Sequence, residues 1–415
     1  MELFRWMRGV ALKRQRASLS TVDAVAQSIG RCIDQLRGET GSDPEREVLL
    51  AFASFLLDGP GTMPPHVPAV VRSALTDIDR IPLAAEATGK GYPDACSAVF
   101  ERFLALLRIS DRNWNGAFYT SSPLADFLVR SADVLLRKIG SAGCADPALT
   151  TIDPACGTGH LLTRALQQAL QSGSPSGKFC GTEILPLATD VCNLRIASLL
   201  GGDSGQCVAD ARCTAGDALL EIPRLSVRAP VLILCSAPFN QYATCTLRSD
   251  SSAAALHASY AAPCARAGLD LHAHTDAYIK FTALYHDLLL RAGAGVAALI
   301  LRNNWLTSHA HAEMRRLLLK DFDEVSIVDL HGDPYDRLHH SQGRDDENVY
   351  GDMVYNVGVC VCFLVRTASG NGTTIIRRAD VFGSRAMKWE WLSRESVASI
   401  PWKTIAPAEP WYGYA

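Results

Sequence analysis

The stretch Thr151-Ile-Asp-Pro-Ala-Cys-Gly-Thr-Gly-His160 decides the fold of this chain. A short apolar segment ends in Asp153, a tight turn follows, and a helix is predicted to begin near Leu161. The turn contains Gly157 and Gly159, whose missing side chains would let the backbone approach a ligand closely. The free N–H groups of a helix start lie at the same place. Such a turn alone is equally typical of an ordinary strand-to-helix connection.

The sequence around this stretch alternates between strands and helices. Strands are predicted at residues 178–184, 209–214, 231–236, 296–301, 324–330, 354–365 and 374–377, and helices at residues 187–199, 275–290 and 311–319, with a further helix ending near residue 136. This alternation predicts an α/β fold: an open, doubly wound and mostly parallel sheet with helices on both faces. Ligands of such sheets bind beyond the carboxyl ends of the strands. The residues expected at those ends include Asp153, Gly157, Glu183, Asp217 and Ser236.

Composition limits the possible classes of protein. The chain has 415 residues, 48% of them hydrophobic and 20% charged, which predicts a soluble protein of two or three domains. No apolar run has the length of a membrane span, and the first residues lack the apolar core of a signal peptide, so we expect a cytoplasmic protein. The net charge of −3 predicts no global basic field, so any nucleic-acid surface must be local. The 13 cysteines include no C-x-x-C pair, which favours reduced thiols and no metal site.

Three regions differ in their sequence pattern. Residues 1–112 have helical spacing and predict an all-α N-terminal domain. Residues 113–366 carry the alternating strands and helices, and residues 367–415 form a weakly patterned C-terminal extension. Within the second region, residues 241–270 are predicted to be a weakly patterned surface insertion, and residues 331–352 a polar loop that faces a substrate.

A nucleotide-like cofactor needs a backbone cradle, an acid for its ribose hydroxyls and a group for its base. The two glycines of the turn, then Glu183, then Asp217 meet these needs in chain order. Glu183 follows the second strand, where an acid accepts hydrogen bonds from ribose hydroxyls, and Asp217 could hold an exocyclic amine. A plain surface acid at Glu183 and a helix N-cap at Asp217 are the simpler alternatives for each residue.

Other polar groups are given structural interpretations. Three histidine pairs lack the spacing and the additional ligands of a metal site, so solvated or hydrogen-bonded histidines are expected. The pairs are His272/His274, His309/His311 and His339/His340. Residues 303–305 are expected to form a turn with a core tryptophan, with contact to DNA as the alternative. The acidic run at residues 345–347 is interpreted as a solvated loop.

Four motifs together resemble those of a known enzyme family. They are Gly116-Ala-Phe-Tyr-Thr120, Asp153-Pro-Ala-Cys-Gly-Thr-Gly159, Gly181-Thr-Glu-Ile184 and Gly216-Asp-Ala218. In sequence and order they are similar to motifs of the gamma class of S-adenosylmethionine-dependent DNA amino-methyltransferases. That class includes the methylase parts of type I, type IIG and type ISP restriction–modification proteins. Asp329-Leu-His-Gly332, Asp345-Asp-Glu-Asn-Val-Tyr350 and Pro410-Trp-Tyr412 also resemble the type ISP and IIG methylases, so the resemblance covers about residues 113–415.

The resemblance implies a class I, Rossmann-like methyltransferase core at residues 113–366, with S-adenosylmethionine as its cofactor. The methionine end of the cofactor would be held by Phe118, Tyr119 and Thr120, and the other contacts would come from Asp153, Ala155, Gly157, Gly159, Glu183, Ile184, Asp217 and Ala218. Glu183 would take the ribose and Asp217 the adenine. Family members transfer a methyl group to an exocyclic amine, usually adenine N6, of a base flipped out of double-stranded DNA.

The same resemblance places the catalytic tetrapeptide at Ser236-Ala-Pro-Phe239. The side chain of Ser236 and the carbonyl of Ala237 would accept the amino hydrogens of the target base. Pro238 would stiffen the loop, and Phe239 would stack on the base. The adenine enzymes have Asn in place of Ser236, which instead resembles the Ser of the cytosine-N4 enzymes. Ala237 replaces a proline, which leaves the loop more backbone freedom and weakens positioning; Ser121 also stands where the family has proline.

Three functions follow as hypotheses. The first is adenine-N6 methylation of DNA in a restriction–modification or phage-defence system. The second, suggested by the altered tetrapeptide, is a catalytically weakened or inactive subunit that binds S-adenosylmethionine or DNA. The third is methylation of a protein or RNA amine. The sequence stops where the family's target-recognition domain would begin, so a separate specificity or restriction subunit is expected as a partner.

Overall fold

The computed structural model describes residues 120–172, 177–200, 210–239, 245–268, 271–333, 346–350, 357–370 and 372–414. The predicted N-terminal domain, Phe118 and Tyr119 lie outside the described residues, as do His339 and His340. None of the helices in the described part combines the length and the apolar content that a membrane span requires.

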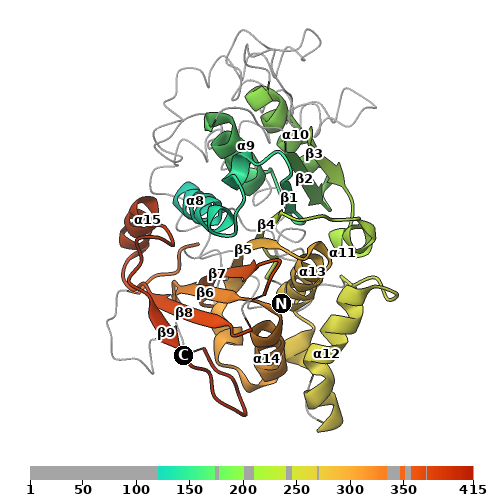
Figure 1. Ribbon diagram of the computed structural model, residues 1–415, viewed down its shortest axis with the longest axis vertical. Coiled ribbons are helices and arrows are strands. Elements are labelled where there is room, and N and C mark those ends of the chain that lie inside the picture. Colours follow the sequence, from blue (N-terminus) through green and yellow to red (C-terminus); the bar gives the residue numbers. More distant parts are fainter. Residues whose placement is uncertain are drawn as a thin grey trace, which may run out of the picture. The chain divides into compact units, whose positions relative to one another are not determined.

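The described residues contain a nine-stranded sheet (Figure 1). Its strands are β1 (Thr150–Asp153), β2 (Lys178–Glu183), β3 (Asp210–Ala215), β4 (Val231–Ser236), β5 (Gly295–Arg302), β6 (Glu324–Asp329), β7 (Val359–Arg366), β8 (Ile375–Asp380) and β9 (Lys403–Ile405). Their order in space is β3-β2-β1-β4-β5-β7-β6-β8-β9, and β7 and β9 run antiparallel to their neighbours. The mostly parallel sheet that the sequence predicts is confirmed.

Helices cover both faces of this sheet, as predicted (Figure 1). One face carries α8 (Ser122–Lys138), α9 (His160–Gln171), α10 (Pro186–Leu200) and α15 (Arg385–Arg394), and the other carries α11 (Ala218–Glu221), α12 (Ser252–Arg266), α13 (Ala277–Ala292) and α14 (Ala312–Asp321). Strand β4 shows how the two apolar cores are divided. Leu232 and Leu234 belong to the first core, and Ile233 and Cys235 to the second. Because alternate residues of a strand face opposite sides, a strand buried on both sides is apolar throughout.

Residues 241–270, predicted to be a weakly patterned surface insertion, contain helix α12. The Oγ of Ser251 caps this helix by accepting a hydrogen bond from the amide of Ala254 at 3.1 Å. Its sequence is rich in alanine, the strongest helix former. The apolar pattern did not reveal the helix, because alanines on several sides leave it without a clear apolar stripe.

The C-terminal region contains more regular structure than its sequence pattern predicts. The strand expected at residues 374–377 extends to Asp380 as β8, and α15 and β9 follow it. Strand β8 pairs in parallel with β6, and β9 pairs antiparallel with β8, so both lie in the central sheet. Strand β7 begins at Val359 rather than at residue 354.

Candidate active site

The carboxyl ends of β1, β2, β3 and β4 lie side by side, because these four strands are parallel and adjacent. Asp153 ends β1, Glu183 ends β2, Ser236 ends β4, and Asp217 follows β3 closely. The structure therefore places four of the sequence-predicted site residues along one edge of the sheet.

A tight turn connects β1 to α9 and is tied to the end of β2. The amide of Cys156 donates a hydrogen bond to the carbonyl of Thr182 at 3.2 Å. The amide of Gly157 donates to Oε2 of Glu183 at 2.9 Å. These two bonds hold the turn beside Glu183, so a ligand that contacts the turn would also meet the Glu183 side chain.

The two glycines of this turn have different surroundings. Both have left-handed backbone, with φ of 55° at Gly157 and 81° at Gly159. A Cβ added to Gly157 would meet no atom within 4 Å. A Cβ added to Gly159 would lie 2.3 Å from Sγ of Cys192 in α10. The missing side chain of Gly159 therefore makes room for helix packing, whereas that of Gly157 leaves open space beside Glu183.

The Glu183 side chain is 8% exposed, so the alternative interpretation of a plain surface acid is wrong. Besides the bond from Gly157, its Oε1 accepts a hydrogen bond from the amide of Leu185 at 2.9 Å. Burial raises the pKa of Glu183 to about 7, although the hydrogen bonds from these amides oppose the shift. Each carboxylate oxygen can accept two hydrogen bonds, so both retain capacity for a ligand hydroxyl.

Three residues near the ends of β2 and β3 have distinct environments. Asp217 is the N-cap of α11, as its structural interpretation predicts, because its Oδ1 accepts from the amide of Leu219 at 2.9 Å. Ala218 is buried in the core on the α11–α14 side. Ile184 is 55% exposed directly after Glu183. Of these three side chains, that of Ile184 presents the largest apolar surface to a ligand.

The predicted catalytic tetrapeptide meets Tyr350, a residue to which the sequence assigned no role. Oγ of Ser236 lies 3.1 Å from the Tyr350 hydroxyl, and either group can be the donor. The rings of Phe239 and Tyr350 are perpendicular, with centroids 6.3 Å apart. Ala237 is buried, and its amide donates to the carbonyl of Ile300 in β5 at 3.3 Å. Proline could not make that bond, so Ala237 provides this loop with a backbone restraint that the sequence comparison with proline did not include.

Tyr350 is positioned by an acidic segment that was interpreted as a solvated loop. That interpretation is wrong for Asp346, which is 8% exposed. Its carboxylate lies 2.7 Å from Nζ of the fully buried Lys388 and accepts hydrogen bonds from the amides of Gly332 and Gly383. The sequence cannot distinguish an acidic run in water from one neutralised by a lysine about 40 residues away, and so it missed this anchor.

Thr120, Asp153 and Ala155 are also predicted site residues, and they lie before α8, at the end of β1 and in the turn after β1. Thr120, 6% exposed, lies two residues before α8. Asp153 is 1% exposed, and its Oδ1 accepts a hydrogen bond from the amide of Ala155 at 3.3 Å. Burial raises the pKa of Asp153 well above its ordinary value. Its role in the structure is therefore to shape the turn after β1.

Comparison with known proteins finds similarity in structure. No family model matches the chain, and no curated protein matches it by sequence. The DrdV–DNA complex matches with a TM-score of 0.68 and 18% identity, over 94% of this chain and 43% of that one. The ATP-dependent type ISP restriction–modification enzyme LlaBIII, bound to DNA, matches with a TM-score of 0.63 and 15% identity, over 94% and 32%. A nuclease-deletion mutant of the type ISP enzyme LlaGI matches with a TM-score of 0.59 and 16% identity, over 98% and 40%.

This chain shares its fold with a part of these restriction–modification enzymes. It spans less than half the length of each of these three solved chains. Identities of 15 to 18% establish a shared fold, so activity has to be argued from the chemistry of the site.

The structure also tests the sequence predictions for the histidine pairs, the tryptophan and metal sites. His274 and His311 are buried and pack ring against ring, with centroids 5.3 Å apart, and burial lowers the pKa of His311 to about 3. The predicted core tryptophan, Trp305, is 1% exposed and is confirmed. Two other groups in the described residues have potential metal-ligating atoms within 4.8 Å of one another: Cys156, Cys192 and Cys213, and Asp329, His331 and Asp380. Sequence spacing does not reveal either group, because its members lie on different elements.

Proposed function

We propose that this chain binds S-adenosylmethionine beyond the ends of β1, β2 and β3 and transfers its methyl group to adenine N6 of a base flipped out of DNA. Its setting would be a restriction–modification or phage-defence system. The observation that carries the proposal is the open space at Gly157, bordered by the Glu183 carboxylate and next to the strand that ends in Ser236. The strand order supports a class I methyltransferase core, as the motifs imply.

The residues present suit the cofactor. Glu183 has acceptor capacity for ribose hydroxyls, Ile184 offers exposed apolar surface for the adenine, and a side chain at Gly157 would occupy the space between strand and ligand. Asp217 is held as a helix cap, so it would contact the adenine amine through the oxygen that does not cap. When bound, the cofactor supplies an electrophilic methyl group.

The tetrapeptide supplies the remaining chemistry. The lone pair of an adenine amine is delocalised into the ring, so the amine is a poor nucleophile. Oγ of Ser236 and the carbonyl of Ala237 would accept hydrogen bonds from the two N–H groups of the amine and orient its nitrogen toward the methyl group. Phe239 would stack on the flipped base, and its contact with Tyr350 would hold the ring in place.

DNA is the proposed substrate, in agreement with the DNA complexes of DrdV and LlaBIII that share this fold. Those chains are more than twice as long as the part matched here, so sequence readout and cleavage are proposed to reside in a specificity or restriction module beyond this core. Phosphate contacts position such a core on DNA, but base contacts are needed to select a site.

The proposal is tested by the transfer of labelled methyl from S-adenosylmethionine to genomic DNA, with the labelled nucleoside identified. We expect label in N6-methyladenine with wild type, and at least a hundredfold less with Phe239→Ala. The matched control is Trp411→Ala, an aromatic residue 48% exposed on the C-terminal tail, which should retain full activity. Label in cytosine would correct the target atom, and failure to bind S-adenosylmethionine would overturn the proposal.

A second candidate function is a binding subunit without turnover. It is favoured by one observation: the Ser236 hydroxyl already has a hydrogen-bond partner in Tyr350. The Tyr350 hydroxyl would therefore compete with the target amine for Ser236. This candidate predicts calorimetric binding of S-adenosylmethionine with no transfer of label by the wild type. Restoration of transfer by Ser236→Asn would assign the loss to the tetrapeptide.

A further inference from the structure

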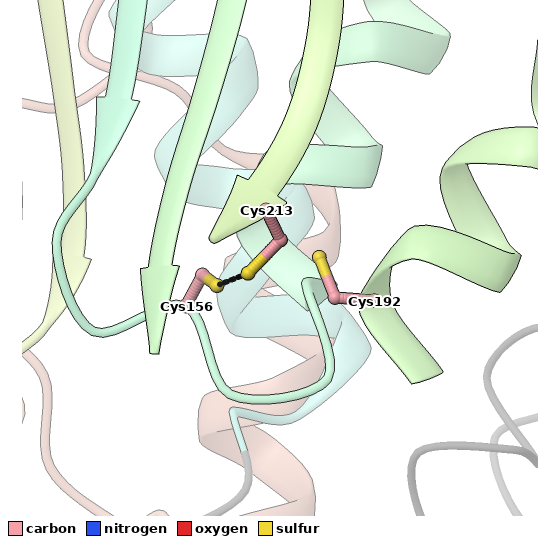
Figure 2. Close-up of side chains that lie close together, drawn as sticks. All are labelled: Cys156, Cys192 and Cys213. Atoms are coloured by element: carbon pink, nitrogen blue, oxygen red, sulfur yellow. Dashed lines mark hydrogen bonds between the residues drawn. The ribbon is translucent and has the colours of Figure 1, made fainter. Parts of the chain in front are cut away.

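Three cysteines from three separate elements lie close together (Figure 2). Cys156 lies in the turn that carries Gly157, Cys192 in α10 and Cys213 in β3. All three are buried, with exposed fractions of 7%, 0% and 5%. Sγ of Cys156 lies 3.1 Å from Sγ of Cys213, and Sγ of Cys192 approaches the same point from the helix.

Glycines at two positions make the space for these sulfur atoms. A Cβ on Gly159 would lie 2.3 Å from Sγ of Cys192, and a Cβ on Gly181 would lie 2.9 Å from Sγ of Cys156. Any larger residue at either position would push the thiols apart. Isolated buried cysteines often serve as small apolar residues. In this group, however, the two glycines lack the side chains that would otherwise separate the sulfur atoms.

The backbone and charge around the thiols are also arranged. Asn193 fixes Cys213 from both sides, because its Oδ1 accepts from the Cys213 amide at 2.8 Å and its Nδ2 donates to the Cys213 carbonyl at 3.0 Å. The guanidinium of Arg195, 3% exposed and one turn after Cys192 in α10, donates to the carbonyl of Thr158 at 3.0 Å. A buried cation thus lies beside the group, where it can offset negative charge.

We propose that Cys156, Cys192 and Cys213 bind a zinc ion through their thiolates. Three thiolates exceed the charge of a divalent ion by one and that of a monovalent ion by two, so a divalent ion leaves less excess charge beside the buried Arg195 cation. Two sulfur atoms on a tetrahedral zinc ion at about 2.3 Å lie about 3.8 Å apart, so Cys156 and Cys213 have to separate by less than 1 Å. A disulfide would use two of the thiols and leave Cys192 unexplained.

The second group of potential metal ligands differs from this one. The other metal-like group, at Asp329, already has the cation of Arg378 between its carboxylates. Zinc at the cysteines would fasten the turn that carries Gly157 to α10 and β3.

The test is zinc binding by the reduced full chain under anaerobic conditions, which does not depend on methyl transfer. We expect one zinc per chain by elemental analysis, tetrahedral cobalt absorption bands after Co²⁺ substitution, and a Tm rise of about 5 °C. Cys156→Ala, Cys192→Ala and Cys213→Ala should each lower zinc affinity at least a hundredfold. Cys144→Ala, at a buried cysteine outside the group, should bind zinc as the wild type does.

X-ray absorption of the zinc-loaded wild type keeps the test independent of whether the variants fold. It should show three sulfur neighbours at about 2.3 Å. Fewer than three sulfur neighbours, or zinc retained by all three variants, would overturn the proposal. So would a reduced, folded wild type that takes up no zinc, or a Cys156–Cys213 disulfide found by mass spectrometry in protein purified anaerobically.

Discussion

Tyr350 is the residue that most changes the view of the tetrapeptide. Its hydroxyl pairs with Ser236 and its ring contacts Phe239, so one side chain touches both proposed catalytic positions. The Ala237 amide adds a bond to β5. The short Ser236 side chain and the missing proline are thus accompanied by restraints from elsewhere in the fold.

Tyr350→Phe should reduce the rate of methyl transfer about five- to tenfold and leave the Kd of S-adenosylmethionine unchanged. The variant loses one hydrogen bond, typically about 1 kcal/mol, at the group that orients the amine. Single-turnover transfer and calorimetry measure the two quantities. Tyr414→Phe is the matched control, because it removes a buried hydroxyl that donates to the carbonyl of Arg315. Equal loss of rate in both variants would contradict a positioning role for Tyr350.

Glu183 should make cofactor binding depend on pH. Its pKa is about 7 in the free protein, and ribose hydroxyls bind the ionised form, so binding below pH 7 releases a proton. We expect affinity for S-adenosylmethionine to rise between pH 6 and 8, by up to about tenfold per unit below the pKa. Glu183→Gln should bind weakly and lose this dependence, whereas Glu390→Gln, on an exposed side chain of α15, should keep it.

The same shift affects the stability of the free protein. The pKa of Glu183 is raised above its usual 4.5, so the stability that it contributes is present below pH 4.5 and is lost as the pH rises through about 7. A dependence of affinity on pH that is the same in Glu183→Gln and wild type would contradict this assignment.

At the scale of elements, the turn between β1 and α9 contains two glycines that serve different purposes. Gly159→Ala should destabilise the protein by about 3 kcal/mol, because its left-handed backbone and the 2.3 Å approach to Cys192 both oppose a side chain. Gly157→Ala should cost about 1 kcal/mol, from backbone strain alone, but should weaken S-adenosylmethionine binding at least tenfold. Thermal unfolding and calorimetry distinguish the two. The proposed location of the cofactor would be wrong if Gly157→Ala bound it normally.

At the scale of the whole molecule, the C-terminal strands and tail complete the structure that holds the site. Tyr414 is fully buried, and the buried Arg315 of α14 donates hydrogen bonds to the carbonyls of Trp411 and Tyr412. The Phe127 ring of α8 contacts Trp391 of α15, with centroids 5.7 Å apart. The region that the sequence left as an extension is therefore packed against both cores.

Removal of residues 367–415 should leave a protein that is insoluble or lacks cooperative unfolding, because it exposes the edge of β6 and both apolar cores. Arg315→Met should lower stability by about 3 kcal/mol, because several backbone carbonyls lose their charged donor. Trp411→Ala, which keeps the carbonyl that accepts from Arg315, should change stability by less than about 1 kcal/mol. The solubility of the truncated protein and the thermal unfolding of all three variants measure these effects. A truncated protein that unfolds cooperatively at the wild-type temperature would show that this region is dispensable.

The sequence by itself determined the alternation of strands and helices, the mostly parallel character of the sheet, and the carboxyl-end positions of Asp153, Glu183 and Ser236. These depend on periodicity and turn residues within short windows, which local sterics and burial dictate. Tertiary structure alone decided the Ser236–Tyr350 pair, 114 residues apart, the Asp346–Lys388 ion pair and the Cys156–Cys213 approach across 57 residues. The register of packed elements sets these contacts. A single sequence carries no local signal for such register, because a buried partner and solvent can satisfy the same side chain.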